Sequence, residues 1–192
     1  MRRKPNAFVL LLLLLLSLYW GYQHYQTKQY TAAILPTYQA MGALHESLEA
    51  IYELGDNDEQ LLPGQIAECG RIQNTLLELE AQLSETTPPT SSAAKIKQTL
   101  TIALGELQQY SAAHAQYLKA CIAASQKLKE LASLGKKLDS SPASYSSLAE
   151  YTAALKQAKV ITNQLEEKKE ADSLIRTTFV SKTKKDLDAL WQ

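Results

Sequence analysis

The residues best suited to chemistry lie on one face of a long amphipathic segment. Tyr110, His114 and Tyr117 sit on an apolar stripe that keeps heptad spacing. If the chain folds back near residue 140, the charged run 166–172 lies at the level of these residues. The sequence therefore predicts a candidate polar core layer of Tyr110 and His114 with Asp172, or with the nearby Glu170.

Such a layer could fix helix register, sense protons or bind a small ligand. Polar residues inside helical bundles commonly specify packing alone, so packing is the preferred interpretation. A small-ligand or proton-sensing bundle built around Tyr110 and His114 is kept as the alternative function.

The two cysteines form a second candidate pair, because in an oxidising compartment Cys69 and Cys121 could form a disulfide. If the helices that carry them fold back near Pro88, the two cysteines are offset by about 14 residues, or ~21 Å along a helix. That offset exceeds the reach of a disulfide. Buried free thiols or an intermolecular bond are the favoured alternatives.

Metal-binding and catalytic patterns are missing from the sequence. His114 and Cys121 are about 10.5 Å apart along a helix, too far to share one ion. Asp56 opens a run that resembles a calcium loop, but Leu61 and Ala67 replace the required glycine and glutamate. Haem-attachment, di-iron, nucleophile-elbow and phosphate-loop motifs do not occur. We therefore predict a non-enzymatic protein without a metal or another cofactor.

Four helices are expected to position these residues. The chain has only 7 Gly and 6 Pro among 192 residues, and its composition favours helix over strand. Apolar spacing and helix breakers predict helices over residues 37–54, 65–84, 92–139 and 142–192. Short connections make consecutive helices antiparallel. The predicted fold is an all-α antiparallel helical bundle, or coiled-coil hairpin, behind a single N-terminal membrane-spanning helix.

The amino-terminal segment predicts a membrane anchor. Arg2, Arg3 and Lys4 precede an apolar run that begins at Ala7, and no charged residue occurs in residues 5–27. As a helix, this uncharged stretch would extend about 34 Å. Aromatic residues follow the leucines where a cleavage site would require small residues.

We therefore predict an uncleaved signal anchor over residues 1–27, with membrane contact through residues 7–27; a cleaved signal peptide is the alternative. The positive charge before the apolar run predicts a cytoplasmic amino terminus. The bundle, residues 28–192, is then expected on the extracytoplasmic side of the cell membrane, in the periplasm or at the cell surface.

Charge is unevenly distributed although the formal net charge is zero. Residues 37–85 contain ten acids and one base, which gives −9, whereas residues 92–139 contain seven lysines and three acids, which gives +4. Electrostatic pairing between the two segments accounts for this pattern. A nucleic-acid partner is not expected, because no basic patch with interleaved aromatic residues occurs.

The two shorter helices should cover only part of the two longer ones, each roughly 70 Å long. An uncovered apolar stripe would then remain for a protein partner or a second copy of the chain. The residues predicted to make that contact are Leu118, Ile122, Leu128, Leu131, Leu148 and Leu155. The predicted function is a membrane-anchored, non-enzymatic interaction or scaffolding module, and no small-molecule partner is identified.

Overall fold

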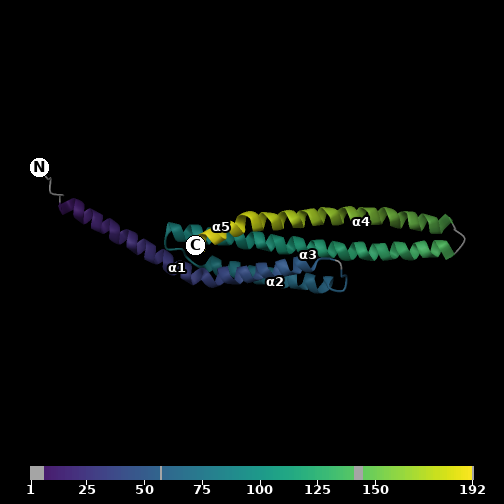
Figure 1. Cartoon of the computed structure of the whole chain (residues 1–192), viewed down its shortest axis with the longest axis horizontal. Coiled ribbons are helices and arrows are strands. Elements are labelled where there is room, and N and C mark those ends of the chain that lie inside the picture. The colour runs from purple at the N-terminus through teal and green to yellow at the C-terminus, as the bar shows by residue number, and fades with distance from the viewer. Residues whose placement is uncertain (1–6, 57, 141–144, 192) are drawn as a thin grey trace.

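A computed structural model describes the backbone of residues 7–56, 58–140 and 145–191, and the side chains of residues 10–56, 58–138 and 148–189. Within these ranges the elements are α1 (Ala7–Leu54), α2 (Leu62–Glu85), α3 (Ser91–Ser140), α4 (Tyr145–Thr178), the π-helical turn η1 (Phe179–Thr183) and α5 (Lys184–Trp191). They form an elongated helical bundle (Figure 1). The prediction of an all-α bundle is confirmed for the described part of the chain.

The first helix is longer than predicted. α1 is continuous over 48 residues, so it joins the predicted helix 37–54 to the segment before it, and it contains Pro36. Proline removes one backbone hydrogen bond and crowds the preceding turn, so it bends a helix without always ending it. Figure 1 shows α1 changing direction as it enters the bundle. Tyr30 and Ile34 already belong to the core, so the part of α1 that projects from the bundle is the stretch before them.

The projecting part of α1 carries the leucine run. Leu10 to Leu16 and Leu18 each expose between 46% and 62% of their surface. Across the described ranges, no helix holds a stretch that is both long enough and apolar enough to cross a membrane.

Helices α1 and α2 are joined by a tight connection. Gly55 adopts a φ of 70°, and its N–H donates to the Tyr52 carbonyl at 3.1 Å, which closes the end of α1. α2 begins at Leu62, three residues before its predicted start, because Pro63 is tolerated in a first helical turn.

Helices α2 and α3 follow the predicted bounds to within three residues at each end. The Thr90 hydroxyl accepts a hydrogen bond from the Ala93 N–H at 3.1 Å and so caps the start of α3. Lys97 donates to the Ser84 carbonyl at 2.9 Å and the Thr86 carbonyl at 2.6 Å, which stabilises the end of α2. These contacts fix the level at which α2 and α3 meet.

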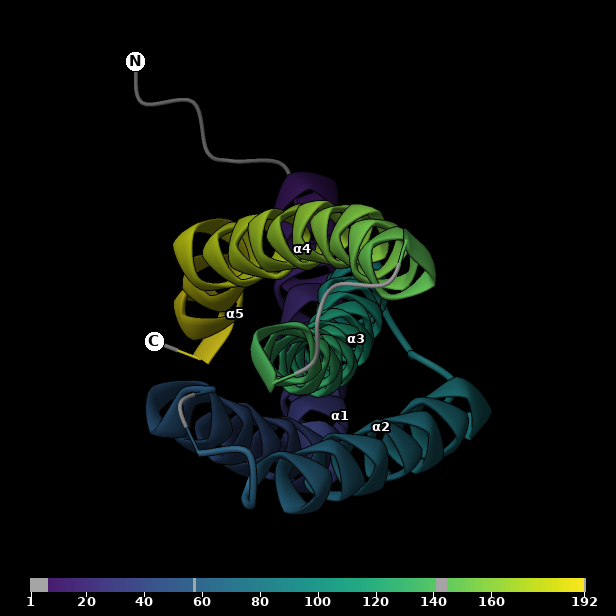
Figure 2. The ribbon, with the colours of Figure 1, turned by 90° about the vertical axis from the view of Figure 1, so that its right-hand side faces the viewer.

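Helices α3 and α4 run side by side as a long hairpin, and α1 and α2 cover only one end of it (Figures 1 and 2). The predicted single helix 142–192 is interrupted, because η1 separates α4 from α5. The buried core lies at the covered end, where Leu48, Ile72, Leu76, Leu104 and Leu107 are fully buried. We call this end the covered half, and we call residues 122–161 the distal hairpin.

Candidate functional site

The covered half contains a polar layer built by three helices. His114 of α3 and Asp172 of α4 are each 2% exposed, and His114 Nδ1 lies 2.8 Å from Asp172 Oδ2. The predicted fold-back near residue 140 places these residues at one level, and the structure brings them into contact. Glu170, the alternative acid, is exposed.

Each partner in this pair keeps one buried polar atom without a hydrogen bond. Among the described residues, His114 Nε2 and Asp172 Oδ1 have no partner. Because a carboxylate only accepts hydrogen bonds, Nδ1 is the donor in the pair and a neutral ring carries its lone pair on Nε2. Two buried polar atoms are therefore left without a hydrogen bond, which native structures rarely tolerate without a reason.

Tyr110, the third predicted member, is fully buried on the same stripe, and its ring packs edge-on against His114 with centroids 6.3 Å apart. Its hydroxyl donates to Glu49 Oε1 of α1 at 3.1 Å instead of joining the His114–Asp172 pair. Burial, together with the nearby Glu49 carboxylate, raises the pKa of Tyr110 above the range in which tyrosine normally titrates.

Glu49 anchors a second part of the layer. Arg176 of α4 donates to both Glu49 oxygens, with Nε at 3.0 and 3.1 Å, and its guanidinium lies 4.2 Å from the ring centroid of Tyr52. Burial disfavours the Glu49 carboxylate, but the hydrogen bonds and charge of Arg176 outweigh it and lower the pKa of Glu49. Glu49 is therefore ionised at neutral pH.

A third part of the layer lies where α1 ends. The Tyr117 hydroxyl donates to Asp56 Oδ2, and Cys121 Sγ lies 3.7 Å from the same oxygen. The Tyr117 hydrogen bond is the main cause that lowers the pKa of Asp56, while burial and that same bond raise the pKa of Tyr117. Asp56 thus links the end of α1 to α3.

Cys69 and Cys121 are both free and buried, so the disulfide considered above is not formed in the structure. Ser111 donates to the Cys69 carbonyl at 2.8 Å, which places Cys69 about ten residues away from the level of Cys121 on α3. Burial raises the pKa of the Cys69 thiol to about 11. The thiols therefore stay protonated at neutral pH and pack as small apolar groups.

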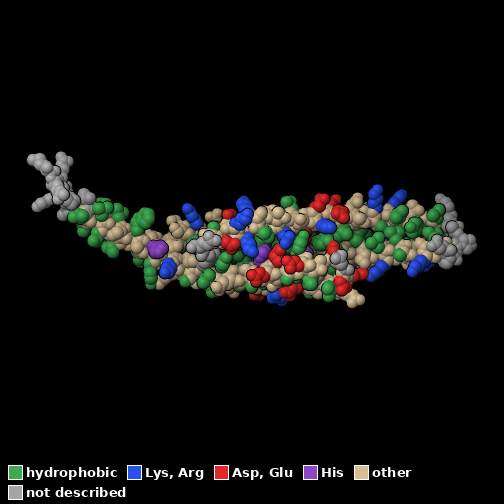
Figure 3. Space-filling view, viewed as in Figure 1, with side chains coloured by type: hydrophobic (Ala, Val, Ile, Leu, Met, Phe, Trp, Pro, Cys, Tyr) green, Lys and Arg blue, Asp and Glu red, His purple; other side chains and the backbone are tan. Residues whose placement is uncertain are grey.

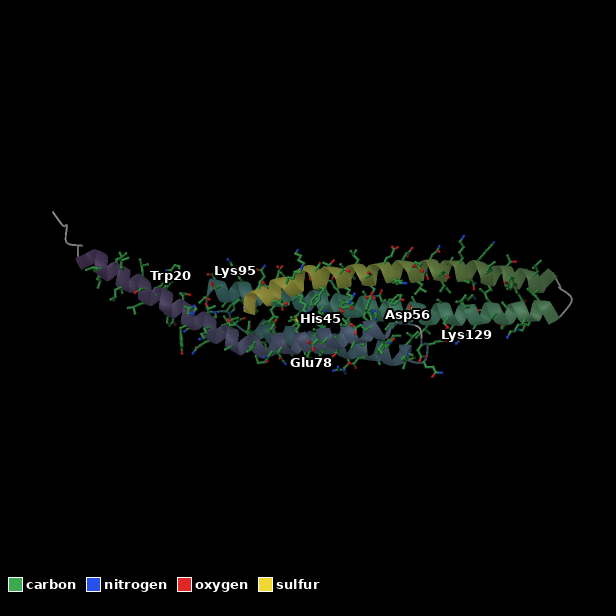
Figure 4. The ribbon with its side chains drawn as sticks, in the orientation of Figure 1. Trp20, His45, Asp56, Glu78, Lys95 and Lys129 are labelled. Atoms are coloured by element: carbon green, nitrogen blue, oxygen red, sulfur yellow. The ribbon has the colours of Figure 1, made fainter. Side chains whose placement is uncertain are left out.

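A cavity of about 190 Å³ opens beside the His114–Asp172 pair. Its buried side chains are His114, Asp172 and Tyr117, and its rim is formed by Tyr52, Gly55, Asp56 and the exposed Lys169. Figure 4 places Asp56 at the end of the α1–α2 pair, where α3 and α4 continue alone.

The second candidate site is the distal hairpin, where most predicted contact residues lie. Leu128, Leu148 and Leu155 are 60%, 53% and 51% exposed, and Ile122 and Leu131 are half-buried. Val160, also on α4, is 56% exposed. Hydrophobic side chains gather along this part of the hairpin in Figure 3, whereas acidic side chains gather over the covered half.

The prediction that Leu118 belongs to the exposed contact surface is wrong. It is 1% exposed and belongs to the main core. The end of α1 and the α1–α2 connection reach further along α3 than expected, since Asp56 contacts Tyr117 and Glu59 pairs with Lys129. Leu118 therefore contributes to stability and cannot line an exposed surface.

Sequence reasoning missed Glu49, Arg176, the contact of Asp56 with Tyr117 and the unpartnered atoms. Glu49 and Arg176 are 127 positions apart in the chain, and no short motif links them. The only available signal was the excess of acids in residues 37–85 next to the lysine-rich third helix. Comparison of the chain with protein-family models, with curated proteins and with solved structures found no match.

Proposed function

We propose that this protein is a membrane-tethered, non-enzymatic interaction module whose distal hairpin binds an acidic amphipathic helix of a partner protein. The observation that carries the proposal is the uncovered apolar surface of the distal hairpin. Over the covered half, α1 and α2 pack against the hairpin of α3 and α4 through α3. Beyond it the same two helices continue, and Leu128, Leu148, Leu155 and Val160 are more than half exposed.

The seam between the two distal helices supports this view. Among the α4 side chains that the structure describes in this hairpin, Ala154 and Ala158 are the buried ones, at 4% and 7% exposure. Alanine buries little apolar area, so this seam contributes far less stability than a seam of leucines. The larger side chains face outward, where a third helix could bury them.

The charge of the distal hairpin indicates the chemistry of the partner. Residues 122–161 contain six lysines and three acids, which gives +3. The helices that lie along the covered half are strongly acidic, with a net charge of −9 over residues 37–85. A partner that continues this arrangement would be acidic and helical, with an apolar stripe. A second copy would instead bring two basic surfaces together, which is unfavourable.

The projecting part of α1 supports attachment to a lipid bilayer. Its leucines are exposed, and Trp20 at 75% and Tyr22 at 60% exposure follow them as interfacial aromatic residues. The basic residues 2–4 precede the leucine run, which favours a cytoplasmic amino terminus with the bundle on the extracytoplasmic side. The bundle would then hold the distal hairpin away from the bilayer.

Photo-crosslinking in intact cells tests the partner. A crosslinking residue at Leu128 or Leu155 should give one dominant adduct with an acidic helical protein, and Lys156→Glu with Lys159→Glu should reduce its yield. The same crosslinker at Ile102, 50% exposed on the covered half, is the matched control. An adduct of twice the chain's own mass, or equal adducts at all three positions, would contradict the proposal.

Membrane attachment is tested separately by alkaline extraction of cell membranes. The unaltered chain should remain with the membrane pellet, and Leu12→Glu with Leu14→Glu should release it. Leu77→Glu changes a leucine of similar exposure, 51%, within α2 and should leave the chain in the pellet. Release of the unaltered chain by alkali would refute attachment by insertion.

A further inference from the structure

We infer that the cavity beside His114 and Asp172 is a binding site for a small primary ammonium ion. The observation behind this inference is a cavity whose inner wall presents two buried polar atoms without hydrogen-bond partners. It is independent of the membrane and partner proposals, because every residue it uses lies in the covered half.

The wall of the cavity carries polar atoms without hydrogen-bond partners. His114 Nε2 and Asp172 Oδ1 have no partner among the described residues, although both side chains are 2% exposed and line the cavity. The Asp56 carboxylate on the rim is a third acceptor. A primary ammonium carries three N–H donors and no acceptor, so its donors match this set.

The charged side chains that line the cavity favour a cation. Asp56 and Asp172 line the cavity together with one cation, the exposed Lys169. Arg176 is engaged by Glu49 through two hydrogen bonds from Nε, so it does not neutralise these acids. The two carboxylates and Lys169 together carry a net charge of −1. A monovalent cation balances it, whereas an anion would meet two carboxylates.

The size and the lining of the cavity indicate which class of cation it would bind. No group of three or more His, Cys, Asp or Glu side chains is placed to hold a metal ion within the described ranges. The cavity of about 190 Å³ is smaller than the pockets of drug-sized ligands, which begin near 300 Å³. Tyr52 and Tyr117 line it as well, and aromatic rings stabilise organic cations. These features favour a short alkylammonium over a metal or a larger molecule.

The test is a titration of the full chain, in detergent micelles and with isotope-labelled histidine, with n-propylammonium chloride. The ring resonances of His114 should shift saturably, while those of His24 and His45 stay in place. Tetramethylammonium chloride supplies the charge without N–H donors, and propan-1-ol supplies the chain without the charge. Neither should reproduce the shift.

Two variants complete the test. Asp56→Asn removes an acceptor charge at the half-buried rim and should weaken binding by about tenfold or more. Asp188→Asn removes a carboxylate from α5, outside the cavity, and should leave binding unchanged. An unsaturable shift, an equal response to tetramethylammonium, or unchanged binding in Asp56→Asn would overturn the inference.

Discussion

The covered half and the distal hairpin use the same two helices in opposite ways. In the covered half, Leu104 and Leu107 of α3 are fully buried beneath neighbouring helices. In the distal hairpin, Leu128 of the same helix is 60% exposed, and Leu155 on α4 is 51% exposed. Heptad spacing alone therefore does not fix burial, because burial also requires enough neighbouring helices to surround the stripe.

The two regions also differ in how they use polar groups. The covered half buries His114 and Asp172 in a cluster that joins α1, α3 and α4, and such a cluster fixes the level of one helix against another. In the distal hairpin the lysines are mostly exposed, and small residues make the seam. The covered half therefore specifies the fold, and the distal hairpin offers a surface.

The largest expected effect is the loss of the buried pair. His114→Ala leaves the Asp172 carboxylate buried without a donor and should lower the free energy of unfolding by about 4 kcal/mol. Chemical denaturation of the chain in micelles measures it, with Lys119→Ala, an exposed site on α3, as the control. A loss below about 1 kcal/mol would show that the layer is hydrated and contributes little to the covered half.

A core truncation should be nearly as costly. Leu104 is fully buried, so Leu104→Ala removes apolar contacts and leaves a void, and it should cost about 3 kcal/mol. Leu104→Met keeps most of the volume and should cost under about 1.5 kcal/mol. If both variants unfold at the denaturant concentration of the parent, the covered half is not the stable part of the molecule.

Acid should weaken the contact between α1 and α4. The folded pKa of Glu49 lies below the ordinary glutamate value of 4.5, so the unfolded chain binds more protons than the folded one. The Glu49 contribution is complete above pH 4.5 and is lost as pH falls through the folded pKa. Glu49→Gln should therefore cost about 1 kcal/mol at neutral pH and progressively less in acid.

Urea unfolding at several pH values measures that dependence. Glu53→Gln, on an exposed site of the same helix, is the control. The difference in the free energy of unfolding between Glu53→Gln and the parent should not change as the pH falls. A difference between Glu49→Gln and the parent that persists in strong acid would mean that Arg176 does not stabilise the folded state through this charge.

The smallest effect on stability is expected in the distal hairpin. Leu155→Gln replaces an exposed leucine and should change the free energy of unfolding by less than about 0.5 kcal/mol. The same substitution should strongly reduce crosslinking to the partner from Leu128. A large loss of stability would show that this surface is already covered, for example by a second copy, and would remove the contrast between the two regions.

Local patterns predicted the helices well where breakers were strong. The bounds of α2 follow from apolar spacing between the Pro63 and Pro88 regions, and those of α3 from apolar spacing between the Pro88 and Pro142 regions of the sequence. The continuity of α1 through Pro36 was not predictable, because proline ends some helices and only bends others. Tertiary contacts decide between the two outcomes.

The site was predictable only in part. The fold-back placed Asp172 opposite His114, since level along a hairpin depends on residue counting alone. A prediction of the Glu49–Arg176 contact would require the rotation of α1 relative to α4, and residue spacing within one helix does not provide it. Leu118 was misplaced for a related reason, because the reach of the α1–α2 connection depends on the Gly55 turn.

The π-helical turn η1 has a consequence for chain length. Phe179 and Leu187 are both 2% exposed although they are eight positions apart. In a regular α-helix, positions eight apart are rotated by about 80°, whereas positions seven apart nearly coincide in direction. The π-helical turn accommodates one extra residue, so Phe179 and Leu187 point toward the same side of the helix. A version of this protein shorter by one residue between Phe179 and Leu187 would therefore keep the same inward face with an uninterrupted α-helix.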